Sequence, residues 1–418
     1  MFFWMLVYLA LVIVRPQEYP ALVDAGLPLL PATLALAFLF WLAGRKSFAA
    51  PQYLLIVAFL AVIVLSEAAN GLLGIALEQL TRFAPTVLAF VIMANAATTQ
   101  RRVLAFMAVF AACSAVLALH GIEQKHLGVG WTGMPLVEGN RIQYIGIFSD
   151  PNDLGLLFVA ALPMAWHLAG RGGLLGLLRL MWLAIVGVLL YGTYLTNSRG
   201  ALLAVAAMVG IYVWRRYGLI AAAVCGGAGM ALMSMLPSRL QDLDASESSA
   251  AGRVDAWYEG FQMFIGQPLF GVGAGNFTDY NYLTAHNSFV LVLSETGYVG
   301  FTIWLAFVGY CFIMMYTILR HRPPLPDAAA VAAWKTEQSL ALALFVALIG
   351  FFVAAFFLSR SYVIILYLVA ALVVGDYTTA RGRFPTLPAF SMRDHWMRWM
   401  ATSAIAIVVL YVLVRVLL

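Results

Sequence analysis

Hydrophobic residues in this chain gather in long runs, which short polar stretches separate. A run such as residues 174–195, LLGLLRLMWLAIVGVLLYGTYL, shows no alternation between apolar and polar positions. A membrane-spanning helix needs about 20 predominantly apolar residues, whereas a barrel strand is shorter and alternates. Backbone groups in lipid must also bond within their own segment, which an unalternated run achieves only as a helix. The pattern therefore predicts an all-α, polytopic membrane protein.

The lengths of the runs predict about 12 to 13 transmembrane helices. The first run, FFWMLVYLALVIV, is short enough to lie partly at the membrane interface. No basic segment precedes it and no small-x-small cleavage site follows it, which predicts a retained helix rather than a signal peptide. The predicted spans are 2–14, 27–43, 51–66, 82–97, 102–119, 153–169, 174–195, 200–214, 217–236, 297–319, 339–358, 362–378 and 399–418.

Composition supports this fold class. Of the 418 residues, 63% are hydrophobic and only 10% are charged, whereas about a quarter of the residues in a soluble domain are charged. The formal net charge of +5 does not indicate a nucleic-acid partner, because the Lys and Arg residues lie in short clusters between predicted spans. The expected surroundings are a lipid bilayer. The 3 cysteines each fall inside an apolar run, so we expect small core residues with neither a disulfide nor a metal site.

Positive charge predicts the orientation, because cytoplasmic connections carry an excess of Lys and Arg. With a cytoplasmic N-terminus, 15 of the 24 Lys and Arg residues fall on the inner side, many as adjacent pairs at helix ends. Both longer polar stretches, 120–152 and 237–296, then lie on the outer face. The inner residues are Arg45, Lys46, Arg101, Arg102, Arg171, Arg179, Arg215, Arg216, Arg320, Arg322, Lys335, Arg381, Arg383, Arg393 and Arg398.

The longest polar stretch divides the chain into three parts. These are N-terminal transmembrane helices at 1–236, a large outer loop at 237–296 and C-terminal transmembrane helices at 297–418. Within the loop, apolar residues recur three to four positions apart and predict an amphipathic helix capped by Ser248 or Ser249. Its apolar face would lie on the membrane surface. The residues of that face are Val254, Trp257, Tyr258, Phe261 and Phe264.

Two outer arginines are candidates for binding an anion. Arg199 lies in LTNSRGALLAV, at the mouth of two predicted spans, and Arg253 opens the predicted amphipathic helix. A guanidinium is a planar fork that suits phosphate, and a helix N-terminus also favours an anion. The alternatives are a snorkelling or lipid-anchoring side chain for Arg199 and a solvated surface charge for Arg253.

His286 is the candidate general base, because a neutral imidazole can take a proton from a hydroxyl near pH 7. It lies in TAHNSF, where the polar loop becomes an apolar run. The alternative is a histidine with a structural role only. The other five histidines fall on the inner side or in the shorter outer loop.

Three further polar motifs lie on the predicted outer face. Residues 141–155, RIQYIGIFSDPNDLG, contain a helix-start signal at Asp-Pro-Asn-Asp, and Arg141 before it is another candidate anion contact. The glycines of GVGAGNF predict a tight turn rather than a dinucleotide site, because no strand precedes them. Asp242 and Asp244 could bind a divalent cation, but a solvated loop is the favoured interpretation.

Five motifs occur in order over about residues 80–378. They are R-x-x-Y-x-G-x-F-x-x-P-N before a helix, L-T-x-S-R-G-A at an outer helix start, G-R-x-x-x-W in the large loop, P-L-F-G-V-G-x-G-N-F, and A-H-N-S-F-x-x-x-x-x-E-x-G. The set resembles the O-antigen ligase and polymerase superfamily of bacterial membrane glycosyltransferases. RPQEYP at 15–20 and the last predicted helix lie outside the resemblance.

The resemblance implies a GT-C-type fold in the bacterial inner membrane, with the active site facing the periplasm. It also implies a glycan donor carried on undecaprenyl pyrophosphate, and transfer without a cofactor or a metal. By motif, Arg199 and Arg253 would hold the donor pyrophosphate, His286 would deprotonate the acceptor hydroxyl, and Arg141 and Asn152 would contribute to substrate binding. Attack opposite the leaving group would invert the anomeric centre.

The acceptor stays open at this point. Lipid A core would make the protein an O-antigen ligase, a second lipid-linked glycan would make it a polymerase, and a protein Ser or Thr would make it an O-oligosaccharyltransferase. A rival function of another class is export of a polysaccharide or lipid. Transporters often show internal repeats and charges at the membrane midplane, whereas this chain shows no visible repeat and its notable polar residues lie at the predicted outer mouth.

Overall fold

The computed structural model describes residues 1–171, 173, 176–235 and 243–418, and at 216, 228–235 and 243–251 it describes the backbone alone. The regular elements of these residues are all helices, which confirms the predicted all-α class. They are α1 Phe2–Val14, η1 Pro16–Glu18, α2 Pro20–Val23, α3 Leu29–Leu42, α4 Gln52–Ala69, α5 Leu73–Ala96, α6 Gln100–Leu127, η2 Gly146–Phe148, α7 Pro151–Ala169, α8 Leu177–Leu195, α9 Arg199–Tyr217, α10 Leu219–Met235, α11 Leu243–Gly266, α12 Phe277–Tyr280, α13 Ser288–Arg320, α14 Ala328–Ala355, α15 Ile364–Arg383 and α16 Met392–Leu417.

Among the described residues, nine helices are long and apolar enough to cross a membrane: α4 to α8 and α13 to α16. This supports the predicted polytopic membrane protein. Each of the other predicted spans coincides with a helix, namely α1, α3, α9 and α10. The first two of these are short, at 13 and 14 residues, which is below the length that a bilayer core requires of an untilted helix.

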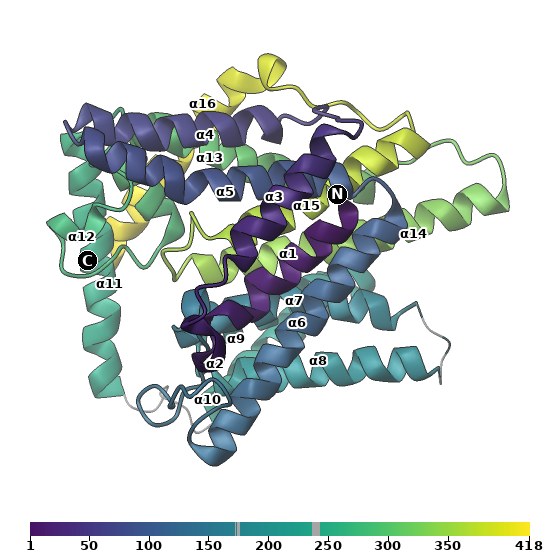
Figure 1. Cartoon of the computed structure of the whole chain (residues 1–418), viewed down its shortest axis with the longest axis horizontal. Coiled ribbons are helices and arrows are strands. Elements are labelled where there is room, and N and C mark those ends of the chain that lie inside the picture. Colours follow the sequence, from purple (N-terminus) through teal and green to yellow (C-terminus); the bar gives the residue numbers. More distant parts are fainter. Residues whose placement is uncertain (172, 174–175, 236–242) are drawn as a thin grey trace.

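The long helices of the bundle run across Figure 1, and α11 stands at its left-hand end, crossing that direction. α7 and α15 form the centre, because 83% and 78% of their spanning windows are buried inside the protein. α8 and α16 are peripheral, with 17% and 11% buried. Helices that are apolar on all sides but little buried need a surrounding apolar solvent, as a bilayer provides.

Several predicted boundaries are wrong. α11 begins at Leu243 rather than after Ser248 or Ser249, so neither serine precedes the helix as a cap. α6 continues to Leu127, and the predicted loop from residue 120 begins later. α13 starts at Ser288 and contains a kink at Gly297, where φ is 62° and ψ is −164°. The predicted span from residue 297 is therefore only the part of α13 that follows the kink.

The kink at Gly297 lets the PLFGVG segment, residues 268–273, pack directly against the backbone of α13. Tyr298 N donates to Pro268 O at 2.8 Å, and Val272 N donates to Ser294 O at 3.0 Å. A Cβ on Gly297 would lie 2.5 Å from the Leu269 carbonyl carbon, so only glycine fits this approach. The predicted tight turn is confirmed, since Gly271, Gly273 and Gly275 all have positive φ.

Two segments outside the family resemblance support neighbouring parts of the fold. In RPQEYP, Arg15 pairs with Glu18, and the Tyr19 hydroxyl lies 2.7 Å from that of Tyr144 in the segment before α7. The last helix, α16, packs against α11 and α13. The Arg415 guanidinium lies 5.3 Å from the ring centroid of Tyr258 on α11.

The three cysteines are free, as predicted. Cys311 is buried and Cys113 is half-buried, whereas Cys225 is exposed on α10, so the expectation of a core residue is wrong for Cys225. Asp242 lies outside the described residues.

Candidate functional site

The first turns of α7 and α9 meet at one end of the bundle. Asp150 caps α7, accepting from Asn152 N at 2.7 Å, and Pro151 occupies the first helical position. Ser198 caps α9 by accepting from Ala201 N at 3.4 Å. Both arrangements follow the usual preferences for helix starts, and the predicted start at 150–153 is confirmed. A Cβ on Gly155 would lie 2.9 Å from Ala201 Cβ, so glycine lets the two helices approach closely.

Hydrogen bonds of Arg141 and Asn152 stabilise the start of α7. Arg141 is 8% exposed and donates from Nε to Thr196 O at 3.0 Å and from Nη2 to Asn152 Oδ1 at 3.0 Å. Asn152 Nδ2 in turn donates to Asp150 Oδ1 at 2.9 Å. The two predicted substrate-binding residues therefore bond to each other and orient the Asp150 carboxylate.

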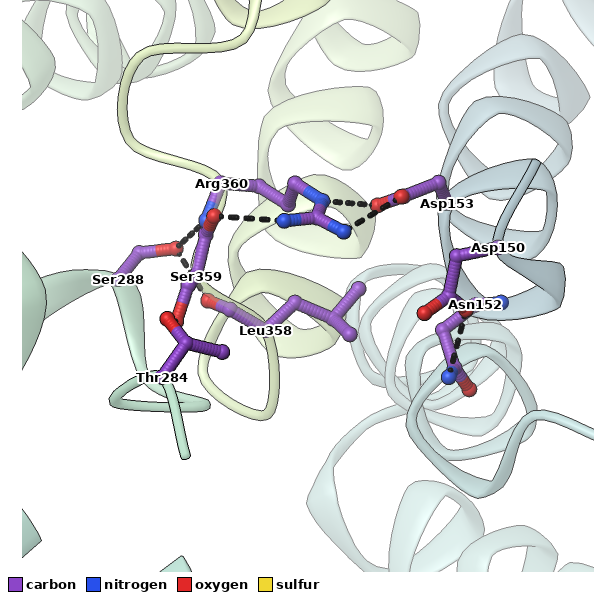
Figure 2. Close-up of polar contacts among 8 residues, drawn as sticks. All are labelled: Asp150, Asn152, Asp153, Thr284, Ser288, Leu358, Ser359 and Arg360. Atoms are coloured by element: carbon purple, nitrogen blue, oxygen red, sulfur yellow. Dashed lines mark hydrogen bonds and ion pairs between the residues drawn. The ribbon is translucent and has the colours of Figure 1, made fainter. Parts of the chain in front are cut away.

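Arg360 bridges the connection between α14 and α15 to the first turn of α7, as Figure 2 shows. Its Nη2 donates to Asp153 Oδ2 at 2.6 Å, and its Nε donates to Asp153 Oδ1. The side chains of Arg360 and Asp153 are 27% and 10% exposed. A bidentate pair with this little exposure fixes the orientation of the Arg360 and Asp153 side chains and favours the charged form of both.

The same connection is bonded to the segment that carries His286 (Figure 2). Thr284 Oγ1 donates to Ser359 Oγ at 2.9 Å, on one side of the histidine. On the other side, Ser288 Oγ donates to Leu358 O at 2.6 Å and accepts from Arg360 N at 2.9 Å. Hydrogen bonds to the 358–360 backbone and side chains therefore hold the segment on both flanks of His286.

His286 has a φ of 46°, in the left-handed region. A residue with a Cβ pays roughly 1–2 kcal/mol there, and such strain persists only where the surroundings enforce it. Here the flanking hydrogen bonds and the next residue provide that enforcement, since Asn287 is fully buried and caps α13 through Phe289 N and Val290 N. Strained residues cluster at functional sites, which makes this outlier a functional signal.

Arg253 comes from α11, which packs over the ends of α13 and α16. Trp257 and Phe261 are 5% and 2% exposed, and the Trp257 ring lies 5.6 Å from that of Phe356, next to the α14–α15 connection. The prediction that this apolar face lies on the membrane surface is therefore wrong for its central residues. A Cβ on Gly252 would lie 3.5 Å from Leu283 Cδ1, close to the His286 segment.

Electrostatic interactions join these residues into one set. Burial lowers the pKa of His286, the positive charges of Arg253 and Arg360 lower it further, and Asp150 opposes them. Burial also lowers the pKa of Arg253, with Arg199 adding to the effect and Asp150 opposing it. We call Asp150, Arg199, Arg253, His286 and Arg360 the charged cluster.

The charged cluster contains three of the sequence-predicted site residues: Arg199, Arg253 and His286. Arg141 and Asn152 lie behind it, in contact through Asp150. Arg360 and Asp153 were missed as site residues. One feature of the sequence could have indicated Arg360. It falls on the predicted outer face, where arginines are less frequent than on the cytoplasmic side.

Comparison with known families supports the resemblance. A family model described as O-antigen ligase matches residues 183–305, and this confirms the similarity to the O-antigen ligase and polymerase superfamily over that region. The matched region holds Arg199, Arg253 and His286. The match supports ligase- or polymerase-type activity in general and implies lipid-linked glycan substrates in a membrane. A search of curated proteins finds no match to this chain.

Proposed function

We propose that this protein transfers a glycan from undecaprenyl pyrophosphate to an acceptor hydroxyl at the periplasmic face of a bacterial inner membrane. The observation that carries the proposal is the charged cluster. His286, a half-buried imidazole, lies within electrostatic reach of Arg253 and Arg360, and Arg253 interacts with Arg199. An imidazole beside several guanidinium groups provides a base next to an anion site.

The arginines of the cluster hold the donor diphosphate. Arg199 and Arg253 bind its oxygens, and their charge stabilises the negative charge that develops as the glycosyl bond breaks. Arg360 adds positive charge, but its Nε and Nη2 groups donate to Asp153, so its role is to position the His286 segment. Arg141 and Asn152 set the orientation of Asp150 at the edge of the site.

His286 acts as the general base. It takes the proton of the acceptor hydroxyl while that oxygen bonds to the anomeric carbon of the donor sugar. The bond from the anomeric carbon to the diphosphate oxygen breaks, and the diphosphate leaves with both electrons. Attack opposite the leaving group inverts the anomeric centre. A lowered pKa suits this role, because it keeps the imidazole neutral near pH 7.

The acceptor is lipid A core or a second lipid-linked glycan, with a protein hydroxyl as the third candidate. A deletion strain separates them. Full-length glycan left on the polyprenyl lipid identifies a ligase, single unpolymerised repeats identify a polymerase, and loss of glycan from protein alone identifies an O-oligosaccharyltransferase. Complementation with His286→Ala tests catalysis in the same strain. If this variant restores the glycan as well as the wild type does, His286 is not the base, and equal tolerance of Arg253→Ala would favour a function of another class, such as export.

A further inference from the structure

A second site lies at the opposite end of the bundle. A cavity of about 840 Å³ opens between α7, α8, α9 and α14. Each helix contributes one face, with lining residues three to four positions apart, as in Val205, Met208, Val209 and Tyr212 of α9. The space is large enough for a lipid-sized ligand, since small-molecule sites are typically about 300–1,000 Å³.

The lining changes from basic to apolar along the helices. Arg171, Arg215 and Lys335 lie at one end, and Leu190 and Val346 line the apolar part. Among the described residues that line the cavity, none is acidic. Lys335 and Val346 are separated along α14 by a rise of roughly 16 Å, which is about half of the ~30 Å hydrocarbon core of a bilayer.

A mostly buried histidine, with one ring nitrogen unpartnered within the described part of the chain, also lines this site. His167 is 8% exposed and lines the cavity. Its Nδ1 lies 3.2 Å from Ser339 Oγ, while Nε2 is buried without a hydrogen-bond partner among the described residues. A buried nitrogen without a hydrogen-bond partner costs free energy. A ligand with a hydrogen-bonding head group would supply the partner that His167 Nε2 lacks among these residues.

The cavity is separate from the charged cluster, although the same helices build both. On α7, Asp153 is at the cluster and Arg171 follows the other end of the helix, roughly 27 Å away by helix rise. The α13–α14 connection, which precedes Lys335, lies on the right of Figure 1, and α11 with Arg253 lies on the left. The charge pattern predicts this end of the bundle to be cytoplasmic.

We infer that the cavity binds an anionic phospholipid of the cytoplasmic leaflet. Its phosphate lies among Arg171, Arg215 and Lys335, its head group reaches His167, and one acyl chain lies along the apolar part. Basic pockets between transmembrane helices on the cytoplasmic side are suited to such head groups. The inference does not depend on the proposed glycan transfer, because the donor diphosphate belongs at the other end.

The test measures lipid retention on the full-length protein, purified in detergent, by native mass spectrometry. Phosphatidylglycerol is the probe. We expect the Arg215→Gln/Lys335→Gln variant to bind it roughly twenty-five-fold more weakly than wild type, because each cation near an anionic head group contributes about five-fold. Arg322→Gln/Arg393→Gln is the matched control, since it removes two predicted inner charges that do not line the cavity.

A second variant tests the apolar part without a change of charge. Leu190→Trp places a large ring in the cavity, and we expect it to displace the bound phosphatidylglycerol as well. Equal retention by all variants would overturn the inference. So would equal binding of phosphatidylcholine, or displacement of the lipid by millimolar inorganic phosphate. Preferential displacement by polyprenyl phosphate would instead assign the cavity to the donor lipid and would also contradict the inference.

Discussion

Arg360 and Asp153 are 207 residues apart in the sequence, and a bidentate ion pair joins them. Arg360 follows α14, and Asp153 lies in the first turn of α7. Through Ser288, the same Arg360 residue bonds to the segment that carries His286. The pair therefore links the candidate base to the helix start that Asp150 caps.

Asp153→Asn should impair both transfer and stability. The substitution leaves the Arg360 guanidinium without its carboxylate, and breaking a fully buried pair costs about 3–5 kcal/mol. Since Arg360 is 27% exposed, we expect a smaller loss of roughly 2 kcal/mol in the free energy of unfolding. Thermal unfolding in detergent and the rate of glycan transfer check this.

The matched control for that prediction is Glu78→Gln, which removes the partner of Arg82 in a pair that is 55% and 66% exposed. An exposed pair contributes about 0–1 kcal/mol, so this variant should behave as wild type. If Asp153→Asn were as harmless as Glu78→Gln, the bridge would not position the His286 segment.

The pH dependence of transfer should report His286. Its pKa lies below the ordinary 6.5, because of burial and the charges of Arg253 and Arg360. A base with a lowered pKa stays active to lower pH, so kcat/KM should fall only below about pH 6.5. Arg360→Gln removes a positive charge, raises the pKa of His286 and should move the acid limb to higher pH. An acid limb that stays in place, or moves lower, would contradict the electrostatic contact.

Arg253→Lys and Arg199→Lys should both be poor substitutes. Lysine keeps the charge but loses the planar fork that binds two phosphate oxygens at once. We expect transfer to fall by about tenfold or more, the equivalent of losing one strong charge-assisted hydrogen bond. Arg82→Lys, at an exposed arginine outside the charged cluster, is the control. Turnover near the wild-type rate in both cluster variants would favour lipid anchoring over donor binding.

Gly297→Ala should destabilise the fold. The alanine would adopt a φ of 62° and place its Cβ 2.5 Å from the Leu269 backbone. Strain at positive φ and overpacking together cost roughly 2–5 kcal/mol. Gly187→Ala in α8, where a Cβ meets nothing within 4 Å, should be neutral or slightly stabilising. Equal thermal midpoints for the two variants would show that the kink does not require glycine.

The sequence predicts the helices well, because hydrophobic run length follows directly from the thickness of a bilayer. The sequence predicts the first and last residues of the helices less accurately. The apolar face of α11 could be predicted from its spacing, but amphipathic spacing does not reveal the partner. Trp257 packs on Phe356, nearly a hundred positions away in sequence, so the predicted membrane-surface position is wrong for its central residues.

The candidate site could be predicted only in part. Arg199, Arg253 and His286 stand in recognisable motifs, and the charged cluster joins all three. Arg360 stands in FFLSRSY, where nothing local distinguishes it from a snorkelling arginine. Its importance arises from Asp153 and Ser288, which only the packing of α7, α13 and α14 brings close. Long-range pairs of this kind leave no periodic signal in the sequence.

In the proposed mechanism, His286 removes the acceptor proton beside arginines that hold a lipid diphosphate. The most direct test is release of polyprenyl pyrophosphate by purified protein, supplied with a lipid-linked glycan and an acceptor. We predict that His286→Ala binds the donor with wild-type affinity but releases polyprenyl pyrophosphate at least about a hundredfold more slowly, as loss of a general base implies. Release at the wild-type rate by a folded His286→Ala protein would contradict it.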